Sequence, residues 1–177
     1  MNIQRLTGKF LLSTPLMDQR GGGLAHAVIY LYAQEAGIIQ GFIVNKALPT
    51  GHNALTKAMG QPEASNPAHD SLYLGGNVSP TRLGVLYQQG GRLQYACSRD
   101  RLSRVFHSEQ RYAAKFLLGY VSWTEPELYG EITAHQWLVA TASASHIFAD
   151  HDHDIRSLIQ EEMGVGDAVL TAVSGTT

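Results

Sequence analysis

The sequence predicts one α+β domain in which a sheet is flanked by several short helices. Short runs of β-branched and aromatic residues dominate the first half of the chain, and apolar residues at helical spacing begin near Ser98. The regular alternation of strands and helices that accompanies a doubly wound parallel sheet is missing. Since 177 residues suffice for one hydrophobic core and fall short of two domains, we expect residues 1–177 to form a single domain.

Six strands are predicted up to residue 98, each bounded by turn residues. They cover residues 8–14, 27–33, 41–47, 71–76, 82–89 and 91–98. Gly90 and Gly91 are expected to join the last two strands as a hairpin. A short helix is expected after Asn53, which is placed as its N-cap, and should end before Gly60.

Three consecutive helices are predicted after Ser98 because the apolar period changes there. Leu102, Val105 and Phe106 share one helical face. The same spacing recurs in a second predicted helix, at Tyr112, Ala113, Phe116, Leu117 and Tyr120. A third helix is expected over residues 124–132, a strand over 135–141, and a last helix over 152–164.

The start of the third helix contains two recognisable signals. Thr124 and Glu127 have the spacing of a capping box, and Trp123 and Leu128 have the spacing of a hydrophobic staple. We therefore expect Trp123 to anchor the beginning of this helix rather than to bind a ligand.

Composition argues against two classes of partner. The net charge is −2, so no overall positive field attracts nucleic acid or anionic lipid. No apolar run of about 18 residues and no signal peptide is found, which predicts a cytoplasmic protein without a membrane span. A single cysteine, Cys97, excludes an intramolecular disulfide and fits a reducing cytosol.

The three predicted helices over residues 98–132 could imitate a helix-turn-helix. Five of the 13 basic residues of the chain fall in this segment: Arg99, Arg101, Arg104, Arg111 and Lys115. The third helix, which would have to enter the major groove, instead carries three glutamates and no basic residue. Phosphate repulsion makes it a poor recognition helix, so direct DNA reading is not expected.

Cys97 is the best candidate for a reactive group. It directly precedes Ser98, the expected N-cap of a helix, where thiol pKa values fall, and Arg99 and Arg101 could help to hold a thiolate. The alternative is that a lone cysteine is a small buried hydrophobe, and no particular histidine is tied to it by the sequence.

His151 and His153 would share one face of an extended chain and could supply half of a metal site. The alternative is a solvated loop whose aspartates cap the last helix, because nothing elsewhere supplies an obvious third ligand. We therefore expect no metal and no cofactor.

The stretch LYLGGNVSPTRLGVLY, residues 72–87, raises the question whether its paired glycines cradle a ligand. Gly75 and Gly76 end a predicted strand, and turn geometry alone can explain them. Alternatively, exposed N–H groups near Gly76 and Asn77 could hold an anion that meets Arg82.

Several motifs together resemble the AlgH-like family, also called YqgE-like. GYVSWTEPELYGEI resembles the family pattern GYxGWxxxQLxxEI, and LYLGGNVSPTRLGVLY is similar to VYLGGPVxxxRGFVLH. GKFLLSTPLMD, GFIVNKAL, SRDRL and HQWLVATASASHIF agree with further family segments in the same order. The resemblance runs from about Leu6 to Gly164.

This resemblance implies a compact α+β fold with a curled, barrel-like, mixed or antiparallel sheet, and no established enzymatic activity or cofactor. The leading hypothesis is a binding or regulatory module with a protein or small-molecule partner, not an enzyme and without direct DNA reading. A thiol-based enzyme or redox sensor using Cys97 is the first alternative. A transcriptional regulator, a label used in the family, is the second.

Overall fold

The computed structural model describes residues 5–49, 54–60, 72–108, 113–150 and 154–164. Its centre is an eight-stranded sheet in the order β6-β5-β7-β3-β2-β1-β8, with β4 paired to β7 beside this path. The strands are β1 (Phe10–Ser13), β2 (Val28–Glu35), β3 (Ile38–Ile43), β4 (Leu72–Leu74), β5 (Val78–Gln89), β6 (Arg92–Ala96), β7 (Ala114–Thr124) and β8 (Trp137–Ala140). Pairs along the path are antiparallel and β4 runs parallel to β7, so the sheet is mixed.

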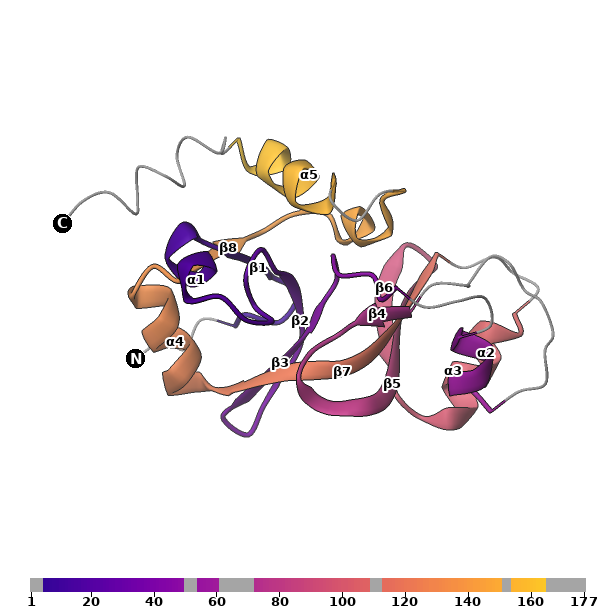
Figure 1. The fold of residues 1–177 in the computed structure, drawn as a ribbon. Helices are drawn as coiled ribbons and strands as arrows, with labels where there is room; N and C mark the ends of the chain where they lie inside the picture. The colour runs from indigo at the N-terminus through magenta and orange to yellow at the C-terminus, as the bar shows by residue number, and fades with distance from the viewer. Residues whose placement is uncertain (1–4, 50–53, 61–71, 109–112, 151–153, 165–177) are drawn as a thin grey trace.

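Five α-helices and one 3-10 helix accompany the described strands: α1 (Pro15–Arg20), α2 (Ala54–Ala58), α3 (Arg99–Phe106), α4 (Glu125–Thr133), α5 (Asp154–Met163) and η2 (Ala144–Phe148). In Figure 1, α2 and α3 lie at one end of the molecule, and α1 and α4 lie at the other. The predicted α+β class is confirmed. The sheet is not closed into a barrel, because β6 and β8 end the order of strands.

The core consists of three buried clusters. One packs Leu128 of α4 against strands β1, β2, β3 and β7. A second packs Ile155 and Ile159 of α5 against another set of strand residues, which includes Phe10 and Phe42. The third joins α2 and α3 to β5 and β7. This last cluster holds α3 against the β5–β6 hairpin.

The predicted helix over residues 112–120 is wrong. Residues Ala114–Thr124 form β7, the long strand that pairs with β5 on one side and with β3 and β4 on the other. Phe116 and Leu117 are successive residues and both are buried, so the two faces of this strand are covered. A strand buried on both faces reads as a continuous apolar run, which periodicity cannot distinguish from a buried helix segment.

The strand β7 also bears on binding of nucleic acid. Between α3 and α4 the described chain contains a central β-strand, so residues 98–132 do not form the three successive helices of a helix-turn-helix. Lys115, one of the five basic residues of this segment, is only 5% exposed, and its ammonium donates to the carbonyl of Val44 at 2.7 Å. The basic segment is therefore not one continuous surface.

The other predicted elements are confirmed with shifted boundaries. β3 begins at Ile38, three residues before the prediction, and β5 begins at Val78. Gly90 and Gly91 adopt φ of 59° and 75°, the left-handed pair that a two-residue hairpin turn requires. Asn53 lies outside the described residues.

The start of α4 is also as predicted. The hydroxyl of Thr124 accepts from the Glu127 N–H, and the Glu127 carboxylate accepts from the Thr124 N–H at 2.8 Å, which completes the capping box. Trp123 and Leu128 belong to the same buried cluster, as the staple requires.

Candidate functional site

Gly75 and Gly76 lie between β4 and β5, where the chain packs closely against the backbone of β7. A Cβ on Gly75 would come within 2.3 Å of the carbonyl oxygen of Gly119, and one on Gly76 within 2.1 Å of the Tyr120 backbone. The N–H of Gly75 already donates to Leu118 O at 2.7 Å. Close packing of two backbones therefore accounts for both glycines without a ligand.

Asn77 and Arg82 are both exposed. The Arg82 guanidinium lies 5.6 Å from the ring centroid of Tyr120 and also hydrogen-bonds the thiol of Cys97. The structure thus brings Arg82 and Cys97 together. An anion held by Gly75, Gly76, Asn77 and Arg82 remains a prediction.

Cys97 is half-buried and lies between β6 and the first residue of α3. Burial raises the pKa of its thiol, and the charge and hydrogen bond of Arg82 lower it by less. The cation that acts on the thiol is therefore Arg82 rather than Arg99 or Arg101. A raised pKa reduces the thiolate fraction at neutral pH, which is the opposite of what a nucleophilic cysteine needs.

His151 and His153 lie outside the described residues. Within the described ranges, no group of three or more His, Cys, Asp or Glu side chains could hold a metal ion. The metal hypothesis for this pair remains untested by the geometry. No helix in the described part of the chain has the length and apolar character to cross a bilayer.

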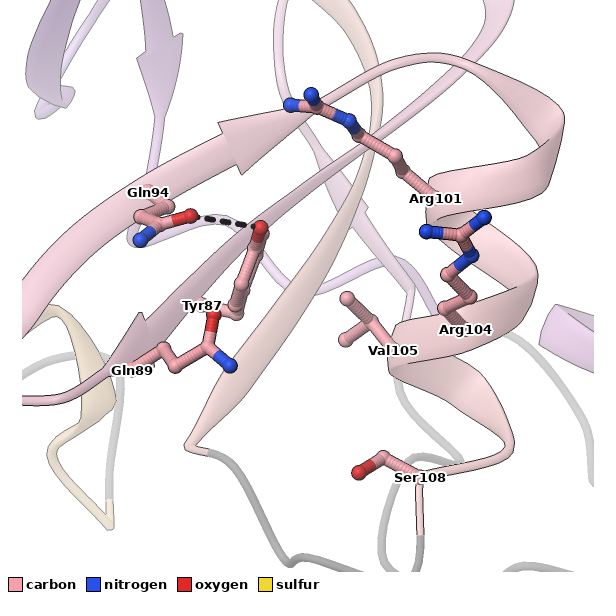
Figure 2. A pocket seen from close by; sticks show the side chains of 7 residues that line it. All are labelled: Tyr87, Gln89, Gln94, Arg101, Arg104, Val105 and Ser108. Atoms are coloured by element: carbon pink, nitrogen blue, oxygen red, sulfur yellow. Dashed lines mark hydrogen bonds between the residues drawn. The ribbon is translucent and has the colours of Figure 1, made fainter.

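A cavity of about 370 Å³ lies between the β5–β6 hairpin and α3. We call it the arginine pocket; its lining residues are Tyr87, Gln89, Gln94, Arg101, Arg104, Val105 and Ser108. Figure 2 shows the last four projecting from α3 and its C-terminal end, with Tyr87, Gln89 and Gln94 on the strands opposite. Its size is at the lower end of the range for small-molecule sites.

The hairpin supplies one wall of the arginine pocket through its register. Tyr87 pairs with Gln94, and Gln89 lies two residues beyond Tyr87 on β5. Because side chains alternate across a strand, all three point to the same face of the hairpin. The glycine turn sets this register.

The helix supplies the other wall. Arg101, Arg104, Val105 and Ser108 follow the i, i+3, i+4, i+7 spacing of one helical face. Leu102 and Phe106, on the neighbouring face, are buried in the cluster that joins α3 to β5 and β7. Burial of that face fixes the direction in which the two arginines project.

The charge of the arginine pocket is positive. Two guanidinium groups line it, and none of the described lining residues is acidic. Neither Arg101 nor Arg104 has a hydrogen-bond or ion-pair partner among the described residues. The Tyr87 hydroxyl donates to the Gln94 side-chain oxygen at 2.9 Å, which orients the Gln94 amide. Two fork-shaped cations beside polar side chains can bind an oxyanion in bidentate geometry.

Sequence reasoning missed this pocket although it noticed Arg101 and Arg104. The sequence places both in a basic segment over residues 98–132, and Arg101 also near Cys97, but it assigns no role to Tyr87 or Gln94. The available signal was the spacing of the two arginines beside Val105, combined with the hairpin register set by Gly90 and Gly91. What the sequence lacks is the contact between that hairpin and α3.

Comparison with known proteins defines the class of protein. The fold is shared with solved α+β proteins: a solution structure of AlgH from Pseudomonas aeruginosa matches with a TM-score of 0.73 at 26% identity, covering 97% of this chain and 96% of that one. A crystal structure of a Corynebacterium diphtheriae protein has the same fold, with a TM-score of 0.68 at 18% identity over 89% of this chain and 87% of that one.

The family follows from the sequence comparisons. A profile described as AlgH-like matches residues 10–166, and the chain therefore belongs to the AlgH-like family. Its relatives include a UPF0301 protein of Methylococcus capsulatus, 30% identical over 81% of this chain and 84% of the relative. The UPF0301 protein AlgH of Pseudomonas aeruginosa is 28% identical over 94% of this chain and 93% of its own length. The predicted family is confirmed, and the family is uncharacterised.

Proposed function

We propose that this protein is a non-enzymatic binding module that takes a small polyvalent oxyanion, such as a diphosphate or a di- or tricarboxylate, in the arginine pocket. The observation that carries the proposal is that Arg101 and Arg104 both line a cavity of about 370 Å³ that has no acidic residue in its described lining. Two cations without a counter-charge repel each other, and a bound anion removes that repulsion.

The geometry favours binding over catalysis. A general acid or base needs a pKa near the working pH, and guanidinium groups stay protonated. The other polar lining groups are hydroxyls and amides, which position a ligand by hydrogen bonding. A partner held by charge and orientation alone fits a sensor or regulatory module.

The two alternatives have less support. A thiol enzyme or redox sensor requires an activated Cys97, whereas burial raises the pKa of that thiol. Direct reading of DNA requires a continuous basic surface, whereas the net charge is −2 and Lys115 of the basic segment is buried. The single cysteine and the charge fit a cytoplasmic protein.

The proposal is tested by calorimetric titration of the protein with pyrophosphate and with citrate. The double variant Arg101→Gln/Arg104→Gln should bind pyrophosphate at least about 100-fold more weakly, since each of the two charge-assisted contacts contributes about 1.5 kcal/mol or more. Arg99→Gln is the matched control, because it removes the same charge from the same helix at a residue that does not line the pocket. Equal losses in the double variant and in Arg99→Gln would show a non-specific charge effect and overturn the proposal.

A further inference from the structure

A second cavity, of about 340 Å³, lies on the other face of the β5–β6 hairpin. Leu86 and Tyr95 are paired across the two strands, one residue away from the Tyr87–Gln94 pair of the arginine pocket. Successive side chains point to opposite faces, so these two pairs face opposite directions. We call this second cavity the tyrosine pocket because Tyr30, Tyr32 and Tyr95 line it.

A row of aromatic rings leads from the core to this cavity. The rings of Phe42 and Tyr32 are stacked with centroids 4.4 Å apart, and those of Tyr32 and Tyr95 are tilted by 45° with centroids 4.5 Å apart. Exposure rises along the row, from 2% at Phe42 and 9% at Tyr32 to 43% at Tyr95. The outermost ring is therefore held in place by the ring beneath it while much of its own surface remains in water. An exposed, fixed ring is a stacking platform.

The buried hydroxyl of Thr7 is a second, independent feature of this cavity. Its oxygen is without a hydrogen-bond partner in the described structure. Buried polar groups are nearly always paired, and leaving one unpaired is unfavourable. Thr7 lines the cavity, and a rotation about its Cα–Cβ bond, which exchanges hydroxyl and methyl, would turn the hydroxyl toward an occupant.

The tyrosine pocket differs from the arginine pocket in charge. Its remaining described lining residues are Leu86, Leu93 and Gln94, so no charged side chain lines it. Burial raises the pKa of both Tyr30 and Tyr32, which keeps their hydroxyls protonated at physiological pH. The walls are apolar surfaces and aromatic rings with a few neutral hydrogen-bonding groups.

We propose that the tyrosine pocket binds an uncharged, planar heteroaromatic ring of about nucleobase size. Stacking on Tyr95 supplies the contact area, and the Thr7 hydroxyl supplies a hydrogen bond to the polar edge of the ring. A purely aliphatic occupant would leave the Thr7 hydroxyl unpaired, and a charged one would meet no counter-ion in the described lining. This site rests on different residues from the proposed function, apart from Gln94, which lines both cavities.

The test measures binding of adenosine, which carries no charge at neutral pH, by saturation-transfer NMR and equilibrium dialysis. Ribose is the control that lacks the ring, and cyclohexanol is the control that lacks aromaticity. Tyr95→Ala should weaken adenosine binding about 5- to 150-fold, the range for loss of one stacked base, while Tyr95→Phe should retain it. Tyr95 is exposed, so the alanine variant is expected to fold.

Thr7→Val keeps the shape of the side chain and removes the hydroxyl. Adenosine should bind this variant about 2- to 12-fold more weakly, while its melting temperature should be equal to or above that of the parent. Arg101→Gln/Arg104→Gln should leave adenosine binding unchanged, so the two sites can fail separately. The proposal is overturned if adenosine does not bind at millimolar concentration, if ribose or cyclohexanol binds as well, or if Tyr95→Ala binds adenosine like the parent.

Discussion

The two faces of the β5–β6 hairpin differ in chemistry although the same two strands build both. The face toward α3 presents Tyr87 and Gln94 beside two guanidinium groups, and the opposite face presents Leu86 and Tyr95 beside two further tyrosines. The period-two alternation of side chains separates the faces, and the register fixed by Gly90 and Gly91 keeps each pair together. A single hairpin can therefore support one site that selects for charge and one that selects for an aromatic ring.

The largest effect on stability should come from a substitution that disrupts the close packing of Gly76, just before β5, against the backbone of β7. A methyl group at Gly76 would lie 2.1 Å from the backbone of Tyr120, which cannot move without disturbing β7. We expect Gly76→Ala to lower the free energy of unfolding by about 3 kcal/mol or more in urea denaturation, and to weaken both sites together.

Gly23→Ala is the control for this substitution. Its added Cβ meets nothing within 4 Å, so its stability should stay within about 0.5 kcal/mol of the parent. A Gly76→Ala protein as stable as the Gly23→Ala protein would contradict the packing explanation and would return attention to a ligand role for Gly75 and Gly76.

The second-largest effect should come from salt, which should weaken ligand binding on one face of the β5–β6 hairpin more than on the other. Arg101 and Arg104 are exposed, so added ions screen their attraction for an anion. Raising NaCl from about 0.05 M to about 0.5 M should weaken pyrophosphate binding roughly tenfold in calorimetry. Adenosine binding at the tyrosine pocket should change less than about twofold, because no charge in the described lining contributes to it. Similar salt dependence for both ligands would mean that they share one site.

A smaller effect is expected from a substitution at the far end of the sheet. One carboxylate oxygen of Glu131 accepts hydrogen bonds from the indole N–H groups of Trp137 at 2.7 Å and of Trp123 at 3.1 Å. Glu131→Gln replaces this charged acceptor by a neutral one and should cost about 1–2 kcal/mol in urea denaturation.

The affinities for pyrophosphate and adenosine should survive Glu131→Gln, because neither pocket uses this carboxylate. Glu161→Gln, at an exposed position of α5, serves as the control and should be neutral within about 0.5 kcal/mol. A loss of ligand binding in Glu131→Gln would show that the hairpin depends on the opposite end of the sheet.

The smallest effect concerns Cys97, which directly follows β6 and packs against the cluster that contains Tyr32 and Leu86. Burial raises the pKa of its thiol, so alkylation by iodoacetamide at neutral pH should be slower than that of free cysteine and should rise steeply only in alkaline solution. Arg82 lowers the same pKa, so Arg82→Gln should raise it further and slow alkylation a few-fold at a given pH. Alkylation faster than that of free cysteine would revive the thiol-based alternative.

Much of the fold could be predicted from local signals. The hairpin turn at Gly90 and Gly91 and the capping box at Thr124 and Glu127 depend on residues close in sequence, and both are confirmed. The strand β7 could not be predicted, because burial of both its faces removes the alternation that identifies a strand. The burial of Lys115 could not be predicted for the same reason, because it follows from the position of Lys115 in this central strand.

The sites were less predictable than the fold. Arg101 and Arg104 are adjacent on a helix face that the sequence does reveal, but their position opposite Gln94 depends on packing of Leu102 and Phe106 against β5 and β7. Tyr32 and Tyr95 are 63 positions apart in the chain and meet only through the sheet order. Contacts of this kind belong to tertiary structure, which periodicity and spacing do not encode.

Binding of an anion in the arginine pocket is tested most directly by a map of backbone amide shifts in ¹H–¹⁵N NMR spectra as pyrophosphate is added. We expect the largest changes at Gln94, Arg101, Arg104 and Ser108, and small changes at Thr7. Changes centred instead on Asn77 and Arg82, with none along α3, would contradict the arginine pocket and place the anion at the glycine loop.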